Sequence, residues 1–574
     1  MNSHLHAQVL LRRFAAATNL LICGRTFLID EGEATSSPHT AGMTEVAAQL
    51  AALLRGLGGR PYTSAHDIPP GTPIQAVFHL DGAQLAPPAA PPPAPPAAPP
   101  PALPGAQRTS DTAPAPCAGP RPALATVHVY NTSPIAVTTA NGTPLTDPYA
   151  ADAAPARERI AWARTHMPVT SRAVADLKSA APSLQDLRIG LSLVLEPKTA
   201  VLALLLAEAG ADVSVFGHAN EVRADVADEL RTQGLAVFAD PHATREEEAQ
   251  LAQDFLARSQ QILLDDGSHL IRRAHQADLA PTALATMIGA AEETTSGLRP
   301  LRTMEADLRI PVVASNDARS KTLFDNAYGT GQSCLFTTLD LLDPDGRGVD
   351  LRGKRVVVAG YGDVGRGFAR LVRALGADSA VAELDPVRAL QAQMDGCTIG
   401  ELTELAASAD WIVSATGVAD TISLEVLQAA RDGAVIFVIG GVDGEVAWAD
   451  AVAAGATWEE DPRRAVEHLW IPTAVFPRDE GGAPLAASAP DKTHANTARR
   501  LTILDRGECL NCTAGEGNPI EIMDLSFAVQ VAALRYLLTA SPTPHPLPPG
   551  LHPLPVEADN AVAAAALTIW NEVQ

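Results

Sequence analysis

The stretch at 356–386, VVVAGYGDVGRGFARLVRALGADSAVAELDP, constrains the fold of this 574-residue chain more than any other. Its β-branched start at 356–358 predicts a buried parallel strand. A GxGxxG turn follows, then apolar residues at helical spacing, then a second short strand that carries Glu383 at its carboxyl end. Strand, glycine-rich turn, helix, strand and acid in this order predict a βαβ unit that binds a dinucleotide.

The glycines and the acid of this unit each have a physical role. Gly360 permits the tight turn, Gly362 lets the backbone approach a pyrophosphate, and Gly365 lets helix and strand pack closely. The helix N-terminus offers unpaired N–H groups to the phosphates. Glu383 lies where a carboxylate reaches the adenosine ribose hydroxyls of NAD. The alternative is a glycine-rich turn in an ordinary βαβ unit, but the complete pattern favours NAD. The predicted cofactor-binding residues here are Gly360, Gly362, Asp363, Val364, Gly365 and Glu383.

Length and charge limit the functions open to the chain. At about 150 residues per domain, the length predicts three or four domains. The formal net charge of -24 argues against nucleic acid or an anionic membrane as the main partner. No segment is expected to be long and apolar enough to span a bilayer, so a cytoplasmic location is the default expectation.

The six cysteines are scattered along the chain, which fits a reducing compartment. Cys509 and Cys512 form the only close pair, in a C-x-x-C spacing. No second pair or nearby histidine completes a zinc site, so we expect no metal.

The first 150 residues read as a small α/β module. Helical patterns at 8–18 and 44–57 alternate with strand patterns at 20–28 and 74–80. Residues 85–122 are then dominated by Pro and Ala, which is typical of an extended polyproline-like linker. Strand patterns resume at 126–130 and 135–139. We therefore interpret the Pro-rich segment as an insertion within an amino-terminal module of residues 1–150.

A regular alternation of strands and helices begins near Asp152 and predicts a parallel, doubly wound sheet. The last strand of this series ends in Asp265, Asp266 and Gly267, where open α/β sheets place ligand groups. The expected strands are 189–194, 213–216, 236–238 and 261–264, and the helices between them are 198–209, 221–233 and 245–258. After the dinucleotide unit we expect strands at 411–414 and 435–439 and a helix at 524–538.

Several spaced motifs give the chain a resemblance to a known family. They are EETTSG at 292–297, SKTLFDNAYG at 320–329, GYGDVGRG at 360–367, the ELDP block at 383–386 and Leu510-Asn511. In this order they resemble S-adenosylhomocysteine hydrolase over residues 152–540. The resemblance implies an α/β fold with a doubly wound substrate-binding domain (151–333, completed by 511–574) and an NAD-binding Rossmann domain (334–510). It also implies a small-molecule nucleoside substrate and a homo-oligomer, either tetramer or dimer.

The resemblance implies a reaction cycle as well. Bound NAD oxidises the ribose 3′-hydroxyl, the ketone acidifies C4′–H, the 5′-thiol leaves, water adds, and the ketone is reduced again. By resemblance Lys321 is the base at the 3′-hydroxyl, with Asp325 beside it, Glu293 holds the ribose, and Asp266 is the acid–base group near C4′. A lysine can act as a base near neutral pH only if its surroundings lower its pKa. The family's NAD contacts match Thr294, Thr295, Ser296, Asn326 and Asn511.

The departures from the family concern the 5′ step, the base pocket and the gate. The family's histidine for 5′ chemistry falls on Val194, and two further histidines fall on Gly441 and Asn518. Where the family has a threonine, this chain has Glu196, and where the family has the acidic residue that helps to recognise adenine, this chain has Lys198. Other changes fall on Thr330 and on Arg388, where a cation would suit a 2′-phosphate that Glu383 would repel.

Three functions remain open from the sequence. One is a hydrolase with rearranged acid–base groups, in which Glu196 or His269 replaces the lost histidine. Another is a nucleoside oxidoreductase or epimerase that works through the same 3′-ketone without releasing a thiol. The last is a non-catalytic NAD-binding regulatory protein, against which the retained Lys321, Asp325 and Glu293 argue. The sequence favours NAD-dependent oxidation of a ribose 3′-hydroxyl.

Overall fold

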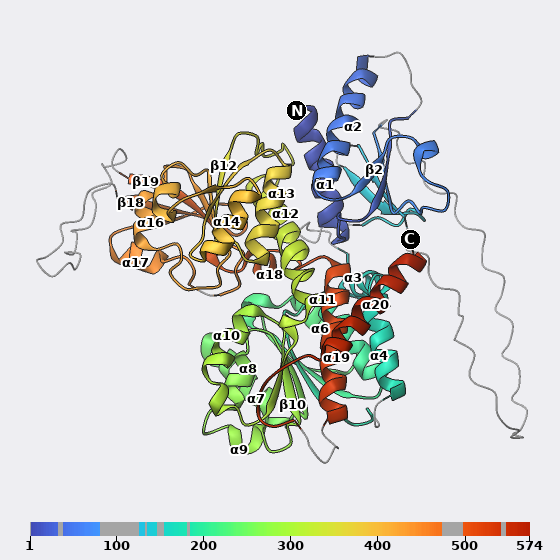
Figure 1. The fold of residues 1–574 in the computed structure, drawn as a ribbon, viewed down its shortest axis with the longest axis vertical. Coiled ribbons are helices and arrows are strands. Elements are labelled where there is room, and N and C mark those ends of the chain that lie inside the picture. The colour runs from blue at the N-terminus through green and yellow to red at the C-terminus, as the bar shows by residue number, and fades with distance from the viewer. Residues whose placement is uncertain are drawn as a thin grey trace, which may run out of the picture.

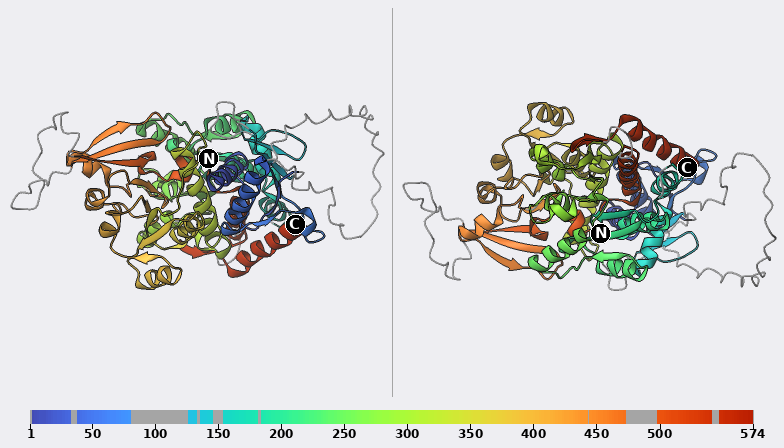
Figure 2. Two further views of the ribbon diagram at one scale, coloured as in Figure 1. Left: turned by 90° about the horizontal axis from the view of Figure 1, so that it is seen from above. Right: turned by 90° about the horizontal axis from the view of Figure 1, so that it is seen from below.

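A computed structural model describes residues 2–32, 38–80, 126–132, 135–145, 154–180, 184–442, 444–472, 498–540 and 547–573 (Figure 1). The described residues form three sheets, and each sheet lies with its own helices in a separate part of the molecule (Figure 1). Figure 2 shows the molecule from above and below. The α/β fold class predicted from the sequence is confirmed. The Pro- and Ala-rich segment predicted at 85–122 lies outside the described residues, and the domain boundaries stay predictions.

The dinucleotide unit, β12 and β13 with the helix between them, lies next to the β14 edge of an eight-stranded sheet with the order β14-β13-β12-β15-β16-β19-β18-β17. From β14 to β19 the strands are parallel, and counted along the chain they run 3-2-1-4-5-6, the order of a dinucleotide-binding fold. The strands are β12 (Arg355–Ala359), β13 (Asp378–Ala382), β14 (Thr398–Ile399), β15 (Trp411–Ser414), β16 (Val435–Val438), β17 (Thr457–Glu460), β18 (Val466–Pro472) and β19 (Ala498–Leu504). Helix α13 (Asp363–Ala374) follows β12 through the glycine-rich turn.

A second, seven-stranded parallel sheet has the order β20-β11-β10-β9-β6-β7-β8. Its strands are β6 (Arg188–Ser192), β7 (Asp212–Phe216), β8 (Ala236–Phe238), β9 (Ile262–Asp265), β10 (Gly289–Glu292), β11 (Pro311–Ala314) and β20 (Gly550–Pro553). The helices of its first crossovers are α5 (Pro197–Glu208), α6 (Ala224–Thr232) and α7 (Arg245–Ala257). Strand β20 returns from the carboxyl-terminal part of the chain, so residues far apart in sequence complete one sheet.

The amino-terminal module has its own sheet, in the order β2-β1-β3-β4-β5. Its strands are β1 (Thr26–Asp30), β2 (Arg60–Tyr62), β3 (Ala76–His79), β4 (Val127–Tyr130) and β5 (Ala136–Thr139). Helices α1 (Ser3–Thr18) and α2 (Pro38–Gly56) pack against each other beside it, with Phe14 of α1 against Phe27 and Phe78 of the sheet.

The prediction of a strand at 20–28 is wrong for residues 20–25, because β1 begins only at Thr26. The backbone of Leu20 and Ile22 bonds instead to the side chain of Gln332. This segment therefore connects the module to the rest of the protein and joins no sheet.

Helix α19 (Ile520–Ala540) is long and apolar enough to cross a membrane by length and composition, contrary to the prediction that no segment would be. However, 72% of its most apolar window is buried within the protein. It packs on α4 (Pro168–Ala180), α20 (Val556–Val573) and strand β10. Core packing explains its apolar character, and the helix also contributes Met523 and Phe527 to the wall of a cavity.

Candidate active site

A cavity of about 510 Å³ lies at the carboxyl ends of neighbouring strands of the second sheet. Because β9, β10 and β11 are adjacent and parallel, the loops that follow them converge at one edge of the sheet. The sequence-predicted residues that line the cavity are Asp266, Glu293, Thr294, Thr295, Ser296, Lys321, Asp325, Asn326, Val364 and Asn511. The predicted residues Gly360, Gly362, Asp363, Gly365 and Glu383 are not among its lining; the first four lie in the glycine-rich turn and the start of α13, and Glu383 follows β13.

Lys321 is the centre of a buried polar cluster. It lies on the short helix α11 (Arg319–Thr322), and the π-helical turn Asp325–Gly329 follows. Its Nζ is 3.0 Å from Oδ2 of Asp325 and 3.5 Å from Oε2 of Glu293. The same amine donates to Oδ1 of Asn326 at 3.1 Å and to Oδ1 of Asn316 at 3.3 Å. The predicted catalytic lysine and two of its acids are therefore in contact.

The charge state of Lys321 differs from what a ready-made base requires. Burial alone would lower the pKa of its amine, but the carboxylates of Asp325 and Glu293 outweigh burial and raise that pKa above its usual value. In the free site the lysine is thus a cation. To act as the predicted base it would have to lose these ion pairs.

Glu293 and Asp266 are harder to ionise than an ordinary carboxyl group. Burial, together with the nearby Asp325 and Asp266, raises the pKa of Glu293 to about 8, although Lys321 opposes the shift. The hydroxyl of Ser526 on α19 donates to Oε1 of Glu293. Burial also raises the pKa of Asp266, against the stabilising charge of Lys321. The site therefore holds groups that can carry protons near neutral pH.

A second layer of polar residues fixes these loops. The carboxylate of Glu292 accepts from the amides of Gly267, Ser268 and Thr294, at 3.0, 2.8 and 2.9 Å. Thr294 caps α10 (Thr295–Thr303), and its hydroxyl donates to Glu292 at 2.6 Å. Thr294 thus lines the cavity, but its hydroxyl serves the loop structure.

The glycine-rich turn fits a dinucleotide. Gly360 has a φ of +91°, and a methyl group at Gly365 would lie 2.1 Å from the carbonyl oxygen of Gly360. At Gly362 a methyl group would meet only the guanidinium of Arg388, at 3.7 Å, so space is left for a phosphate at the N-terminus of α13. Glu383 accepts from the amide of Tyr361 at 2.6 Å, which holds the acid beside this turn.

The positions where the family resemblance predicts histidines hold groups that cannot shuttle a proton at neutral pH. Val194 lines the cavity as an aliphatic side chain. Asn518 donates its amide to Asp325 and to Oγ1 of Thr330 at 3.2 Å, and it accepts from Asn511 at 2.9 Å. It links the cofactor side of the cavity to the acid beside Lys321, which is a structural role.

Cys509 and Cys512 also line the cavity, and both thiols donate to Oδ1 of Asn511, at 3.3 and 3.8 Å. The neighbouring thiol of Cys509, together with burial, raises the pKa of Cys512 well above its usual value. Within the described residues, no group of three or more His, Cys, Asp or Glu side chains could hold a metal ion. The pair therefore acts as a hydrogen-bonding support for Asn511.

Glu196 and Lys198 form a buried ion pair in the cavity wall, with Nζ and Oε2 2.8 Å apart. Glu196 also caps α5 by accepting from the amides of Lys198 and Thr199, at 2.9 and 3.3 Å. The lysine donates to the carbonyl oxygen of Glu516 at 2.6 Å. Because its oxygens are occupied in this way, Glu196 is a poor replacement for the lost histidine.

His269 lies on the cavity wall beside Asp266. Its ring folds over Gly267, because a methyl group at Gly267 would lie 2.6 Å from Cδ2 and Nε2 of His269. Nδ1 of the ring is 3.3 Å from the guanidinium of Arg272. Edge-on to it, at 4.7 Å between ring centres, lies His218, which is hydrogen-bonded to Glu248 at 2.9 Å. A titratable side chain thus lies next to the predicted C4′ acid–base group.

Sequence reasoning missed Asn316, Ser526 and His218. Asn316 follows the buried strand β11, so the rule that ligand groups follow strand ends could have identified it. Ser526 lies on a helix more than two hundred residues away from Glu293, and no local signal predicts that contact.

Known proteins similar to this chain match it over most of its length. The family model of the S-adenosyl-L-homocysteine hydrolase NAD binding domain matches residues 334–473. An S-inosyl-L-homocysteine hydrolase from Methanopyrus kandleri is 35% identical over 414 residues, which cover 72% of this chain and 89% of that protein. An adenosylhomocysteinase from Thermotoga maritima is 34% identical over 417 residues, with 71% and 93% covered. NAD is therefore the cofactor for which the glycine-rich turn is built.

Similarity to solved structures is weaker. A glyoxylate reductase from Paecilomyes thermophila is 16% identical, with 45% of this chain and 75% of that protein covered and a TM-score of 0.26. An S-inosyl-L-homocysteine hydrolase from Methanosarcina mazei, by contrast, is 35% identical over 416 residues, with 71% of this chain and 91% of that protein covered. The sequence relatives, and not the solved structures, identify the family.

Proposed function

The chain belongs to the S-adenosyl-L-homocysteine hydrolase family, and we propose that it oxidises the ribose 3′-hydroxyl of a purine nucleoside thioether and then cleaves the bond between C5′ and sulfur. The observation that carries this proposal is the contact of Lys321 with Asp325 and Glu293 in a cavity that also borders the NAD-binding domain. NAD, when bound, accepts a hydride from C3′ and later returns it.

Lys321 takes the proton of the 3′-hydroxyl. A ribose hydroxyl placed between Lys321 and Glu293 interrupts their 3.5 Å ion pair, while the amine stays buried. The substrate must also separate the amine from Asp325, 3.0 Å away, because burial lowers the pKa of the lysine only when both charges are withdrawn. Glu293, held by Ser526, grips the neighbouring ribose hydroxyl.

Asp266 and His269 serve the elimination step. Asp266 removes the proton from C4′, the bond from C5′ to sulfur breaks, and the leaving thiolate takes a proton from His269. The position of His269 beside Gly267 supports this pairing. His218, hydrogen-bonded to Glu248, packs edge-on against the ring of His269. Since Val194 cannot move a proton, His269 replaces the family's lost histidine.

The base end of the cavity favours a 6-oxopurine. Leu193, Phe527 and Met523 provide apolar surface for a flat ring, with Glu196 and Lys198 beside them. An ammonium group only donates hydrogen bonds and a carboxylate only accepts them. Two of the three N–H donors of Lys198 serve Glu196 and Glu516, and the third complements the O6 acceptor of hypoxanthine or guanine better than the N6 donor of adenine. The named substrates of relatives include both adenosyl and inosyl thioethers.

Cofactor absorbance and thiol release together test the proposal. Purified protein is incubated with S-adenosyl- and S-inosylhomocysteine and with free nucleosides, while the near-ultraviolet absorbance of reduced cofactor and the release of thiol are followed. We expect cofactor reduction with ribosyl compounds and thiol release from the inosyl thioether. No reduction with any ribosyl compound would contradict the proposal.

The second candidate is a nucleoside oxidoreductase or epimerase, favoured by the loss of the histidines at Val194 and Asn518. It predicts cofactor reduction and a changed nucleoside, without thiol release from either thioether.

A further inference from the structure

We propose that the amino-terminal module forms part of the substrate site: Asn19 fixes the backbone that positions Lys198, so the module sets the affinity for the nucleobase. This inference rests on the proposed function for the identity of the ligand. The contacts that carry it do not depend on that function. Asn19 is a positioning residue, because it reaches the cavity only through its neighbours.

The central observation is a carbonyl oxygen shared by two domains. The carbonyl of Glu516 accepts from Nδ2 of Asn19 at 3.1 Å and from Nζ of Lys198 at 2.6 Å. Lys198 and the next residue of the turn, Gly517, both line the cavity. A methyl group at Gly517 would lie 3.9 Å from the lysine amine, so turn and amine are close neighbours. The carbonyl of Glu516 therefore joins the module directly to a cavity-lining cation.

Asn19 is itself rigidly placed. It ends α1 in the left-handed conformation, with φ of 47° and ψ of 37°, and its amide donates to the carbonyl of Ala15. Its own carbonyl accepts from the amide of Ile520, the first residue of α19, at 2.9 Å. Asn19 thus donates to Glu516, in the turn before α19, and accepts from Ile520 at the start of that helix. Such paired bonds fix both orientation and distance.

The other side of the Glu516 turn is also held firmly. The carboxylate of Glu516 pairs with Arg159 at 2.6 Å, and Arg159 in turn reaches Asp225. The amide of Gly517 donates to the carbonyl of Asn511 at 2.8 Å. The side chain of Glu516 is thus anchored to the substrate-binding domain. Among the described residues of the amino-terminal module, only the side-chain amide of Asn19 donates to the backbone carbonyl of Glu516.

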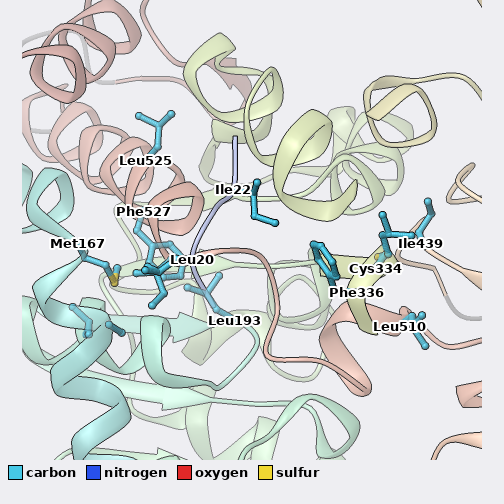
Figure 3. Close-up of a cluster of buried hydrophobic side chains, with 14 of the residues drawn as sticks. Leu20, Ile22, Met167, Leu193, Cys334, Phe336, Ile439, Leu510, Leu525 and Phe527 are labelled. Atoms are coloured by element: carbon cyan, nitrogen blue, oxygen red, sulfur yellow. The ribbon is translucent and has the colours of Figure 1, made fainter. Parts of the chain in front are cut away.

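The segment after Asn19 reinforces the same wall. The backbone of Leu20 and Ile22 bonds to Gln332 of α12 (Thr330–Leu342) at 2.9 and 2.8 Å. The amide of Leu21 donates to Glu521 of α19 at 3.0 Å. Leu20 is fully buried, in the cluster of Figure 3 that also contains the cavity-lining Leu193 and Phe527. Three contacts thus connect one short segment to elements that line the cavity.

Alternatively, these contacts only attach the module to the protein. The two explanations differ in what a lost contact changes. Attachment alone predicts equal weakening of every ligand together with lower stability. Positioning of Lys198 predicts weaker binding only for ligands that carry a base, since the sugar end of the cavity is held by Lys321 and Glu293.

The test uses Asn19→Gly in the full chain with bound NAD. Glycine tolerates the left-handed conformation, so the end of α1 is retained while the amide donor is lost. We expect the Kd of inosine to rise about three- to tenfold, as loss of one hydrogen bond predicts, with the Kd of methyl β-ribofuranoside unchanged. Asn19→Asp, which places a carboxylate against the carbonyl, should weaken inosine binding further. His66→Ala, on an exposed turn of the same module, is the matched control and should change neither Kd.

A double-mutant cycle and hydrogen exchange complete the test. In a Lys198→Met background, Asn19→Gly should have no further effect on inosine binding. Hydrogen exchange in residues 516–520 should become faster in Asn19→Gly, whether or not any nucleoside binds. Unchanged exchange together with an unchanged inosine Kd, or equal losses for both ligands, would overturn the inference. Failure of the wild-type protein to bind any ribosyl compound would instead count against the proposed function.

Discussion

The amine of Lys321 lies 3.5 Å from a carboxylate oxygen of Glu293, although the two residues follow different strands of the substrate sheet. Both are buried, and both have a raised pKa. Lys321 therefore carries a proton at neutral pH, and Glu293 takes up or releases one near pH 8. This relationship is the basis of the chemistry proposed for the cavity.

Replacing Lys321 with Met should abolish oxidation of the ribose. The variant removes the base, so we expect the rate of cofactor reduction to fall by about 10²- to 10⁴-fold, with the NAD content of the protein unchanged. Lys354→Met is the matched control, because that side chain is half-exposed and pairs only with Asp410 among the ion pairs of the described residues. Retained reduction in Lys321→Met would assign the base role to another group.

The raised pKa of Glu293 predicts a pH-dependent stability. Between its ordinary 4.5 and about 8, the folded protein holds a proton on this group that the unfolded chain has released. The contribution of Glu293 to stability is therefore fully present below about 4.5 and is lost as the pH rises through 8. In Glu293→Gln the thermal midpoint should therefore decrease less between pH 4.5 and about 8 than it does in the wild type. Calorimetry of the protein without substrate measures this difference. The exposed Glu404→Gln should leave the curve unchanged, and parallel curves for Glu293→Gln would refute the pKa assignment.

Two glycines of the dinucleotide turn should respond differently to the same substitution. At Gly365 a methyl group would clash with the carbonyl of Gly360, so Gly365→Ala should lower both the thermal midpoint and NAD binding. At Gly362 the space is open and φ is -70°, so Gly362→Ala should fold normally and lose affinity only for NAD. Thermal scans with and without NAD separate the two. Normal NAD affinity in Gly362→Ala would show that the pyrophosphate does not approach this position.

The dinucleotide unit and both parallel sheets could be predicted from local sequence patterns. The turn at Gly360 and the acid Glu383 lie within one βαβ unit, where spacing alone determines proximity. Asp266 could be placed because it follows a predicted strand of a parallel sheet, whereas Glu293 is assigned through the family resemblance alone. For the turn, Glu383 and Asp266, a short-range pattern and one rule of sheet geometry are sufficient.

Contacts between distant segments could not be predicted in this way. Residues at 20–28 have the composition of a strand, but the first of them bond to Gln332, three hundred residues later in the chain. Similarly, the pairing of Lys198 with the carbonyl of Glu516 depends on how α19 returns to the substrate sheet. The raised pKa of Lys321 likewise follows from the sum of surrounding charges, which motif spacing does not provide.

The last prediction concerns His269, which we propose as the proton donor to the leaving thiolate. His269→Gln keeps the size and polarity of the side chain but removes its titration, so the two halves of the reaction should separate. We expect reduction of the cofactor by a nucleoside thioether to continue, because Lys321 is untouched, while thiol release falls by about 10²-fold or more. The exposed His242→Gln is the matched control and should affect neither half. Equal loss of reduction and release would indicate that His269 acts on substrate binding, whereas full thiol release would assign the proton to another group.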